Sequence, residues 1–171
     1  MIKLKSIAAA ALVALGAVGA HASDSTWGAH PATPVLVGAW NPAGSFLDTY
    51  SFSLASSASV TSSVLSFGNT LGGTYSVWSY GTDGLFGTAD DAQLGAWGLS
   101  ALPGPAANHT LALGAGSYYY AVGGRALTGG SSYALASNAV AAPVPEPETY
   151  ALLGAGLGVI GFVASRRRRD S

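Results

Sequence analysis

The sequence predicts an all-β protein whose body is a small antiparallel β-sandwich of the jelly-roll or immunoglobulin-like kind. Three observations support this prediction. Through much of the central region, apolar residues alternate with serine and threonine, which is the period of a strand with one buried face. Clusters of glycine and proline separate these short segments. Between the two terminal apolar blocks, no stretch shows the 3.6-residue period of a helix.

Composition divides the 171 residues into three regions. Hydrophobic residues make up 49% of the chain and charged residues only 9%, where about 25% charged is ordinary. The apolar excess lies in two blocks, 7–20 and 150–164. We therefore expect a leader at 1–22, a β-sandwich body at 23–142 and a C-terminal segment at 143–171. Because the chain has no cysteine, the body must be held by its own core, for which about 120 residues are enough.

The charge distribution argues against nucleic-acid binding. Between Ser23 and Pro145 the only base is Arg125, against five aspartates. A surface that binds nucleic acid needs lysines and arginines to neutralise phosphates, and this region has no such patch. We expect no nucleic acid among the partners.

The first 22 residues have the three parts of a secretory signal peptide. Two lysines precede an uncharged apolar stretch, 7–19, which is too short to span a bilayer comfortably. Ala20 and Ala22 supply the small residues of an A-x-A cleavage site, and this places the mature start at Ser23. Two alternatives stay open: cleavage two residues earlier, and an anchor helix that is not cleaved.

The C-terminal segment also has three parts. Pro145-Glu146-Pro147 lies in a proline-rich acidic stretch that favours extended polyproline II structure. The uncharged run 149–165 follows, and as a helix it would be about 25 Å long, against about 30 Å for the hydrocarbon core of a bilayer. The four arginines at 166–169 favour the cytoplasmic side of a membrane. We predict a single short transmembrane helix that stops transfer.

This order of parts resembles the PEP-CTERM sorting signal. In that family the tail is a substrate of exosortase, an integral-membrane enzyme similar to cysteine transpeptidases, in Gram-negative bacteria that make exopolysaccharide. The resemblance implies export through the inner membrane, transient anchoring, and delivery to the outer surface or the biofilm matrix. It also implies recognition by Pro145, Glu146 and Pro147, retention by 149–165, and orientation by Arg166, Arg167, Arg168 and Arg169.

Within the body, the period-two pattern predicts six strands. They cover 49–54, 60–67, 74–80, 110–113, 117–122 and 133–140. In the fifth strand, Tyr118, Tyr120 and Val122 share one face. The ring of Tyr119 must then lie on the opposite face, where it meets either solvent or a partner.

The first strand carries a second resemblance. Phe46, Asp48, Tyr50 and Phe52 resemble the signature of the FxDxF subgroup of PEP-CTERM proteins, with Tyr50 where the subgroup has its second phenylalanine. The added hydroxyl needs a hydrogen-bond partner or an exit to the surface. The subgroup implies no established activity. We expect Asp48 to cap backbone N–H groups at a turn or strand end, with a ligand-binding or catalytic role as the alternative.

Three carboxylates form a candidate calcium site. Asp83, Asp90 and Asp91 lie close together in a stretch hinged by glycines, and carboxylate oxygens are the ligands that Ca²⁺ prefers. The spacing does not match an EF-hand loop. The alternative is a polar hairpin loop in which Asp83-Gly84 makes a turn. Calcium is the only cofactor that the sequence suggests.

The aromatic and histidine residues give weaker indications. We expect the four tryptophans in the core, with stacking on sugars of an exopolysaccharide as the alternative. They are Trp27, Trp40, Trp78 and Trp97. His30 and His109 are isolated in the sequence. The chain has no cysteine nucleophile, no G-x-S-x-G elbow and no phosphate-binding glycine loop.

We therefore expect an exported structural or matrix-associated protein without catalytic activity. The alternative is a surface module that binds carbohydrate or calcium. A second alternative is an exported hydrolase that uses Asp48 with a distant histidine.

Overall fold

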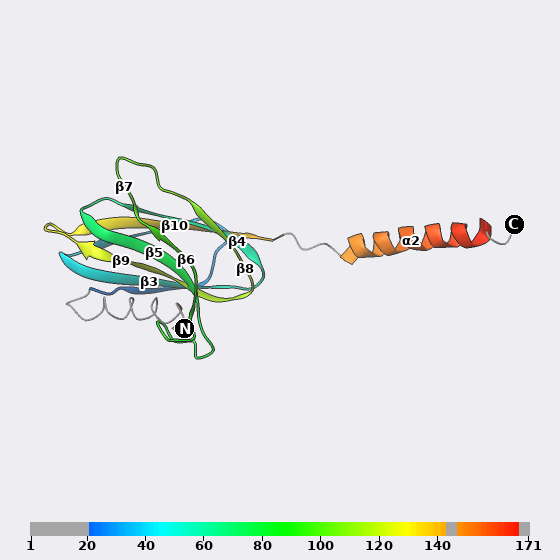
Figure 1. Ribbon diagram of the computed structural model, residues 1–171, viewed down its shortest axis with the longest axis horizontal. Helices are drawn as coiled ribbons and strands as arrows, with labels where there is room; N and C mark the ends of the chain where they lie inside the picture. Colours follow the sequence, from blue (N-terminus) through cyan, green and yellow to red (C-terminus); the bar gives the residue numbers. More distant parts are fainter. Residues whose placement is uncertain (1–20, 143–146, 168–171) are drawn as a thin grey trace, which may run out of the picture. The chain divides into compact units, whose positions relative to one another are not determined.

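The computed structural model describes residues 21–142 and 147–167, and the chain divides into two compact units between Ala141 and Ala142. In the first unit, the described residues form ten strands in two sheets (Figure 1). The second unit contains the helix α2 (Pro147–Arg167). The body is thus a β-sandwich, as its sequence predicts.

Each sheet has five strands. The first sheet has the order β1 (Asp24–Ala29), β3 (Gly44–Leu54), β9 (Gly116–Ala126), β5 (Thr70–Ser79) and β6 (Ala92–Gly98). The second has the order β2 (Val35–Asn41), β10 (Ser131–Ala141), β4 (Ala58–Ser66) and β7 (Ser100–Ala101), with β8 (His109–Leu113) also paired with β4.

Both sheets are mixed. Most neighbouring strands are antiparallel, but β1 runs parallel to β3 and β7 runs parallel to β4. The purely antiparallel sandwich predicted from the sequence is wrong in this respect. Alternation along a strand records which side chains face the core, whereas strand direction depends on how the connections run. The parallel pairing of β1 places Asp24 beside Thr49, in the middle of β3.

The six predicted strands correspond to β3, β4, β5, β8, β9 and β10. The pattern does not predict β1, β2, β6 and β7, and all four lie at sheet edges, as does the predicted strand β8, which pairs only with β4. An edge strand has a neighbour on one side only, and these four leave many of their side chains exposed. Their sequences therefore lack the strong alternation that marks the central strands.

The core between the sheets is largely aromatic. Phe46 and Phe52 of β3, Tyr120 of β9 and Tyr133 of β10 are all buried in it. The rings of Phe52 and Tyr120 stack with their centroids 5.1 Å apart. Phe46 and Tyr133 stack across the two sheets at 6.1 Å. Aromatic pairs of this kind add about 0.5–1.5 kcal/mol each beyond the burial of their area, so they help to hold a body without disulfides.

The outer face of the first sheet carries a second, smaller apolar cluster around Tyr119. This side chain is fully buried, and its ring lies parallel to that of Trp78 with the centroids 6.1 Å apart. Tyr80 and Phe86 complete the cluster, with centroids 4.8 and 4.9 Å from the Tyr119 ring. The predicted placement of Tyr119 on the opposite face is confirmed, but the expectation that its ring meets solvent or a partner is wrong, because the β5–β6 connection of the same chain, which includes Phe86, covers it.

The helix α2 covers the segment 149–165, for which the sequence predicts a helix. Pro147 is its first residue, a position where the missing N–H of proline costs no hydrogen bond. Apolar side chains along the helix, such as Leu152 and Ile160, are exposed. None of the helices in the described part of the chain is long and apolar enough to cross a membrane. The predicted transmembrane segment is therefore a helix, but it is not confirmed as a membrane span. Its glycines have no side chain and so lower the mean hydropathy of the helix.

Candidate functional site

The residues that resemble the FxDxF signature lie on the inner face of β3. Phe46, Asp48, Tyr50 and Phe52 occupy alternate positions of this strand, and all four side chains are buried. Asp48 stands near the middle of the strand, so the prediction of a turn or strand-end position is wrong. The Tyr50 hydroxyl has a buried partner, as expected: its oxygen lies 2.7 Å from that of Tyr133.

Asp48 joins the two sheets through three hydrogen bonds. The backbone N–H of Ser23, just before β1, donates to Oδ1 at 3.0 Å. The Asn41 amide of β2 and the Tyr133 hydroxyl of β10 donate to Oδ2, at 3.0 and 2.7 Å. Nothing in the local sequence around Asn41 or Tyr133 identifies them as partners of a carboxylate. The sequence analysis therefore misses them.

The tyrosines beside Asp48 stay protonated over a wide pH range. Burial, followed by its hydrogen bonds with Tyr50 and Asp48, raises the pKa of Tyr133 far above the ordinary value for tyrosine. Burial likewise raises the pKa of Tyr50. Both hydroxyls thus keep the protons that they need as hydrogen-bond donors.

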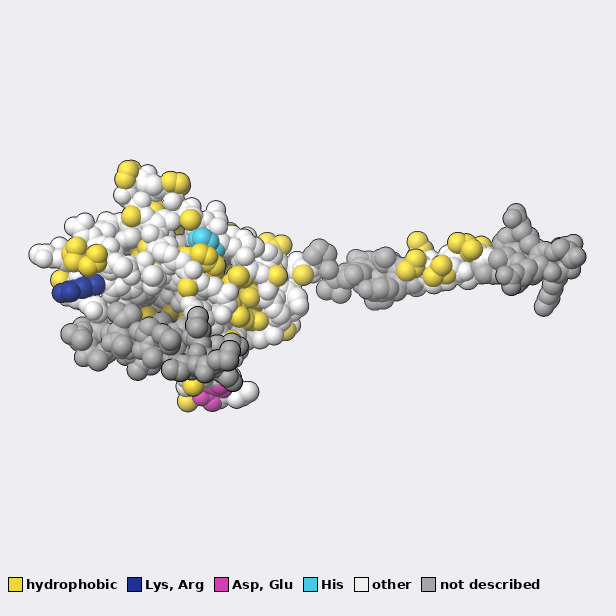
Figure 2. Space-filling view, viewed as in Figure 1, with side chains coloured by type: hydrophobic (Ala, Val, Ile, Leu, Met, Phe, Trp, Pro, Cys, Tyr) yellow, Lys and Arg dark blue, Asp and Glu magenta, His cyan; other side chains and the backbone are white. Residues whose placement is uncertain are grey.

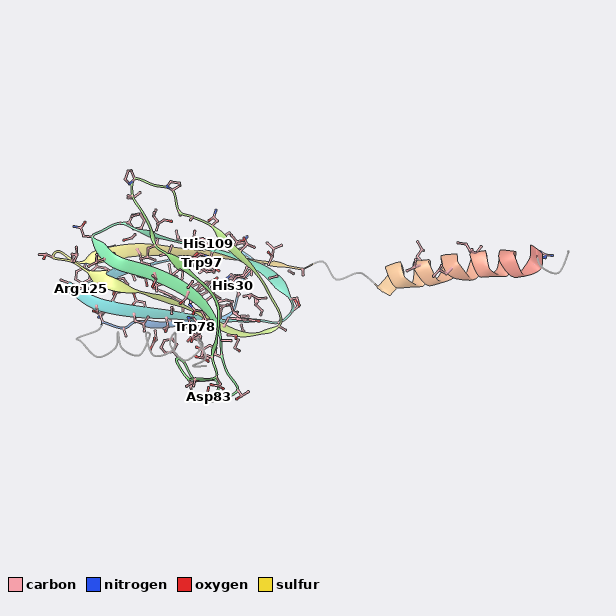
Figure 3. The ribbon with its side chains drawn as sticks, viewed as in Figure 1. His30, Trp78, Asp83, Trp97, His109 and Arg125 are labelled. Carbon is pink, nitrogen blue, oxygen red and sulfur yellow. The ribbon has the colours of Figure 1, made fainter. Side chains whose placement is uncertain are left out.

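The cluster lacks a positive charge. Among the described residues, no lysine or arginine donates a hydrogen bond to Asp48, although its side chain is fully buried. The only arginine of the strands, Arg125, lies at one end of the body (Figure 3). The buried Oδ1 of Asn41 has no hydrogen-bond partner. A buried carboxylate without a cation and a buried acceptor without a donor lie next to each other, and both would be satisfied by a cationic N–H group.

A cavity of about 330 Å³ adjoins this cluster. It is lined by His21, Ser23, Ser25, Val37, Gly38, Ala39, Trp40, Asn41, Asp48 and Tyr50. Trp40 is the most exposed of the four tryptophans, with 62% of its surface accessible. The other three pack against the two hydrophobic clusters, so the expectation of core tryptophans holds for them but is wrong for Trp40.

The two histidines of the strand region have other partners. His30 Nε2 lies 2.8 Å from Ser137 Oγ, and its ring stands edge-on to Phe52. The His109 ring stacks on Trp97 with the centroids 4.4 Å apart, and both are labelled in Figure 3. Neither histidine forms a hydrogen bond with Asp48 among the described contacts, so the arrangement offers no acid–base pair between them.

The three candidate calcium ligands lie in the connection between β5 and β6, which projects from the body at Asp83 (Figure 3). On the face shown in Figure 2, the acidic side chains gather in this connection. Asp91 accepts hydrogen bonds from the Gly81 and Gly87 backbone N–H groups and from the Tyr119 hydroxyl, at 2.7, 2.8 and 2.8 Å. It therefore fixes the loop to the outer apolar cluster.

Asp90 and Asp83 also accept hydrogen bonds from the loop itself. Asp90 receives the Thr82 backbone N–H at 2.7 Å and the Thr88 hydroxyl at 2.6 Å. Asp83 receives the Leu85 N–H at 2.9 Å. Over the described residues, no group of three acidic or histidine side chains is arranged to hold a metal ion. The calcium site stays a prediction from the sequence alone.

Acid should loosen this loop only at very low pH. The Thr88 hydroxyl, together with the Thr82 side chain and backbone, lowers the pKa of Asp90 from 3.8 to about 2. Because the folded pKa is depressed, the contribution of Asp90 to loop order is fully present above about pH 4 and is lost as the pH falls towards 2. Carboxyl ¹³C NMR titration of the native chain should show this low pKa.

The variant Thr88→Val removes the largest cause of the shift and should return the Asp90 pKa most of the way towards 3.8. Equal pKa values in the native and Thr88→Val chains would contradict this account of the loop.

The residues assigned to sorting lie partly outside the described part of the chain. Residues 1–20, including Ala20, are not described, and neither are Pro145, Glu146, Arg168 and Arg169. Ala22 is exposed ahead of β1. Pro147 and Arg167 are the first and last residues of α2, and the Arg166 side chain is exposed.

Comparison with known proteins identifies the PEP-CTERM protein-sorting motif over residues 143–169. This agrees with the resemblance of the tail, while membership of the FxDxF subgroup is not confirmed. The motif implies exosortase-dependent sorting of an exported protein. A search among curated proteins found no match.

Two solved structures show a distant similarity to part of this chain. The pre-peptidase C-terminal domain of collagenase from Bacillus anthracis is 15% identical, with a TM-score of 0.46 over 69% of this chain and 97% of that domain. PliG from Aeromonas hydrophila, a periplasmic inhibitor of g-type lysozyme, is 11% identical, with a TM-score of 0.46 over 70% of this chain and 100% of that protein.

Proposed function

We propose that this chain is exported through the inner membrane behind a cleaved signal peptide, held briefly by its C-terminal segment, and released by exosortase to the outer surface or the biofilm matrix. The PEP-CTERM motif over 143–169 carries this proposal. The enzyme recognises Pro145-Glu146-Pro147, and the arginines at 166–169 keep the end of the tail cytoplasmic.

The composition of α2 suits transient anchoring in a membrane. Leu152, Leu157 and Ile160 expose most of their surface, and lipid would bury these apolar side chains. Gly154 and Gly158 have open space around their Cα atoms and add almost no apolar area. Transfer into lipid stabilises a helix of this composition less than a leucine-rich helix, because less apolar area is buried. The processing enzyme therefore acts on a substrate that the membrane holds weakly.

After delivery, the body acts as a structural component without catalysis. Asp48 is fully buried, and its two carboxylate oxygens already accept three hydrogen bonds, so we assign it to stabilising the body rather than to acting on a substrate. His30 and His109 are engaged with Ser137 and Trp97. These contacts support a stabilising role for the polar residues of the body.

Intact masses of the surface and membrane fractions test the sorting proposal, with the full chain expressed in a host that has exosortase. We expect a mature species that begins at Ser23 and ends near Pro145-Glu146-Pro147. The same chain in a strain without exosortase serves as the control and should keep its tail. A surface species that still contains Arg166 to Arg169 would mean simple tethering and would contradict sorting by cleavage.

A polysaccharide ligand is the second candidate, favoured by the position of Trp40. Its exposed ring lies at a cavity that the polar residues Ser25 and Asn41 also line. An aromatic face beside hydrogen-bonding groups is a suitable surface for a sugar ring. Trp40→Ala should abolish the retention of the mature chain on host exopolysaccharide, whereas Leu36→Ala, at another exposed position of β2, should leave it unchanged. Equal retention of both variants would remove this candidate.

A further inference from the structure

The buried Asp48 carboxylate lies within hydrogen-bond distance of the first residue of the expected mature chain. Cleavage by signal peptidase hydrolyses the Ala22–Ser23 bond with one water molecule. Ala22 leaves with the leader as a carboxylate, and the Ser23 nitrogen becomes an α-ammonium group. In the structure this nitrogen already donates to Asp48 Oδ1 at 3.0 Å.

We propose that the Ser23 α-ammonium group created by removal of the leader is the counter-ion of buried Asp48. Processing then supplies the positive charge that this carboxylate lacks. This inference rests on the proposed cleavage before Ser23. The intact chain places a neutral amide at this point, whereas the mature chain places a full positive charge there. A buried carboxylate gains most from a partner that is both charged and hydrogen-bonded.

The surrounding backbone holds the Ser23 nitrogen in place after cleavage. The Ser23 carbonyl accepts the Thr49 N–H at 2.8 Å, and the Thr49 hydroxyl donates to Asp24. Asp24 also begins the parallel pairing of β1 with β3. None of these contacts involves a residue that cleavage removes.

Cleavage has a cost that the ion pair must offset. The His21 N–H donates to the Ser45 carbonyl, and the His21 carbonyl accepts the Leu47 N–H, both at 3.0 Å. These two bonds disappear with the leader, but His21 is exposed and water can replace it. In return, the ammonium group brings additional N–H donors to the cavity that also contains Asn41, whose Oδ1 has no partner.

The inference is specific to the Ser23 start. Cleavage two residues earlier would place the ammonium group on His21, whose nitrogen lies beside the Ser45 carbonyl and not beside Asp48. Ser23 would then keep a neutral amide. The two cleavage sites therefore predict different environments for the N-terminal amine.

The pH dependence follows from the groups around the ammonium. Asp48 accepts a hydrogen bond from the Ser23 nitrogen, Tyr133 donates to the same carboxylate, and Tyr50 lines the same cavity. None of these side chains can carry a positive charge. A carboxylate partner raises the pKa of the amine above its ordinary value of about 7.7. The stabilisation is then fully present below about pH 7.7 and is lost as the pH rises through the raised value.

The chain offers an unusually clean test because lysine occurs only in the leader, at positions 3 and 5. In a chain from Ser23 to Ser171, the α-amine is the only amine. This mature chain can be released in detergent from an N-terminal fusion by a protease that leaves no extra residue. The rate of acetylation as a function of pH, followed by intact mass, then reports the pKa of this single group.

We expect an α-amine pKa at least about one unit above 7.7, which means roughly tenfold slower acetylation than in the urea-unfolded chain at the same neutral pH. The acetylated chain should melt several degrees below the free-amine chain at pH 7, and this difference should disappear above the raised pKa. The matched control is the chain that begins at His21, whose amine should titrate normally and whose acetylation should leave the Tm unchanged.

The variant Asp48→Asn identifies the partner, because its amine should titrate near 7.7 and its Tm should not depend on acetylation. If this variant does not fold, the comparison of the Ser23 and His21 chains decides the question. An ordinary amine pKa in the folded Ser23 chain, or equal Tm values before and after acetylation, would overturn the proposal. The native start is read separately from the surface-fraction masses, so a failure of processing is distinguishable from a failure of the ion pair.

Discussion

Replacing Asp48 by alanine should destabilise the body by about 3 kcal/mol or more. The change leaves three donors without their acceptor, namely the Ser23 N–H, the Asn41 amide and the Tyr133 hydroxyl. Each buried donor that loses its partner costs about 1–3 kcal/mol. Because domains of this size are stable by only about 5–15 kcal/mol, the loss is a large fraction of the total. Urea unfolding of the variant and of the native chain, followed by tryptophan fluorescence, measures it.

Two variants of the same strand serve as controls. Ser53→Ala removes only an exposed hydrogen bond to the Gly28 carbonyl and should change stability by less than about 0.5 kcal/mol. Tyr50→Phe removes the outermost hydroxyl of the cluster but leaves the Tyr133–Asp48 bond in place, so it should cost only about 1 kcal/mol. An Asp48→Ala chain as stable as Ser53→Ala would show that the cluster does not stabilise the sandwich.

Replacing Pro145, Glu146 and Pro147 together by alanine should reduce the released surface species to background. The triple change removes both prolines of the sorting motif and the carboxylate between them. Total expression should stay the same, because the fold of the body does not depend on this segment, which lies in the other compact unit. Quantification of the body in membrane and surface fractions checks this expectation.

The neighbouring substitution Glu148→Ala is the matched control, since it removes an acidic residue just outside the motif. We expect it to be released normally. If the triple variant reached the surface as efficiently as this control, recognition would not depend on the Pro145-Glu146-Pro147 motif.

The sequence alone predicts the central strands of the sandwich and the sorting tail. The alternation of large apolar residues in the segments that form β3, β9 and β10 records which side chains face the core, and that information is local. For the same reason, the sequence shows that Tyr119 lies on the opposite face from Tyr118 and Tyr120, but not that the β5–β6 connection covers its ring. The tail is likewise a linear signal, in which the order of prolines, apolar run and arginines carries the information.

Only the tertiary structure decides what lies across from each side chain. Ser23 and Tyr133, which meet at Asp48, are 25 and 85 positions away from it. The parallel edge strand β1, which delivers Ser23 to the cluster, has no local pattern that marks its direction. Local periodicity specifies the face on which a residue lies, but the partner on that face depends on strand order and register, which the packing of the whole chain determines. The sequence therefore determines the central strands and the tail, whereas the fold decides that Asp48 joins both sheets and accepts a hydrogen bond from Ser23, the first residue of the proposed mature chain.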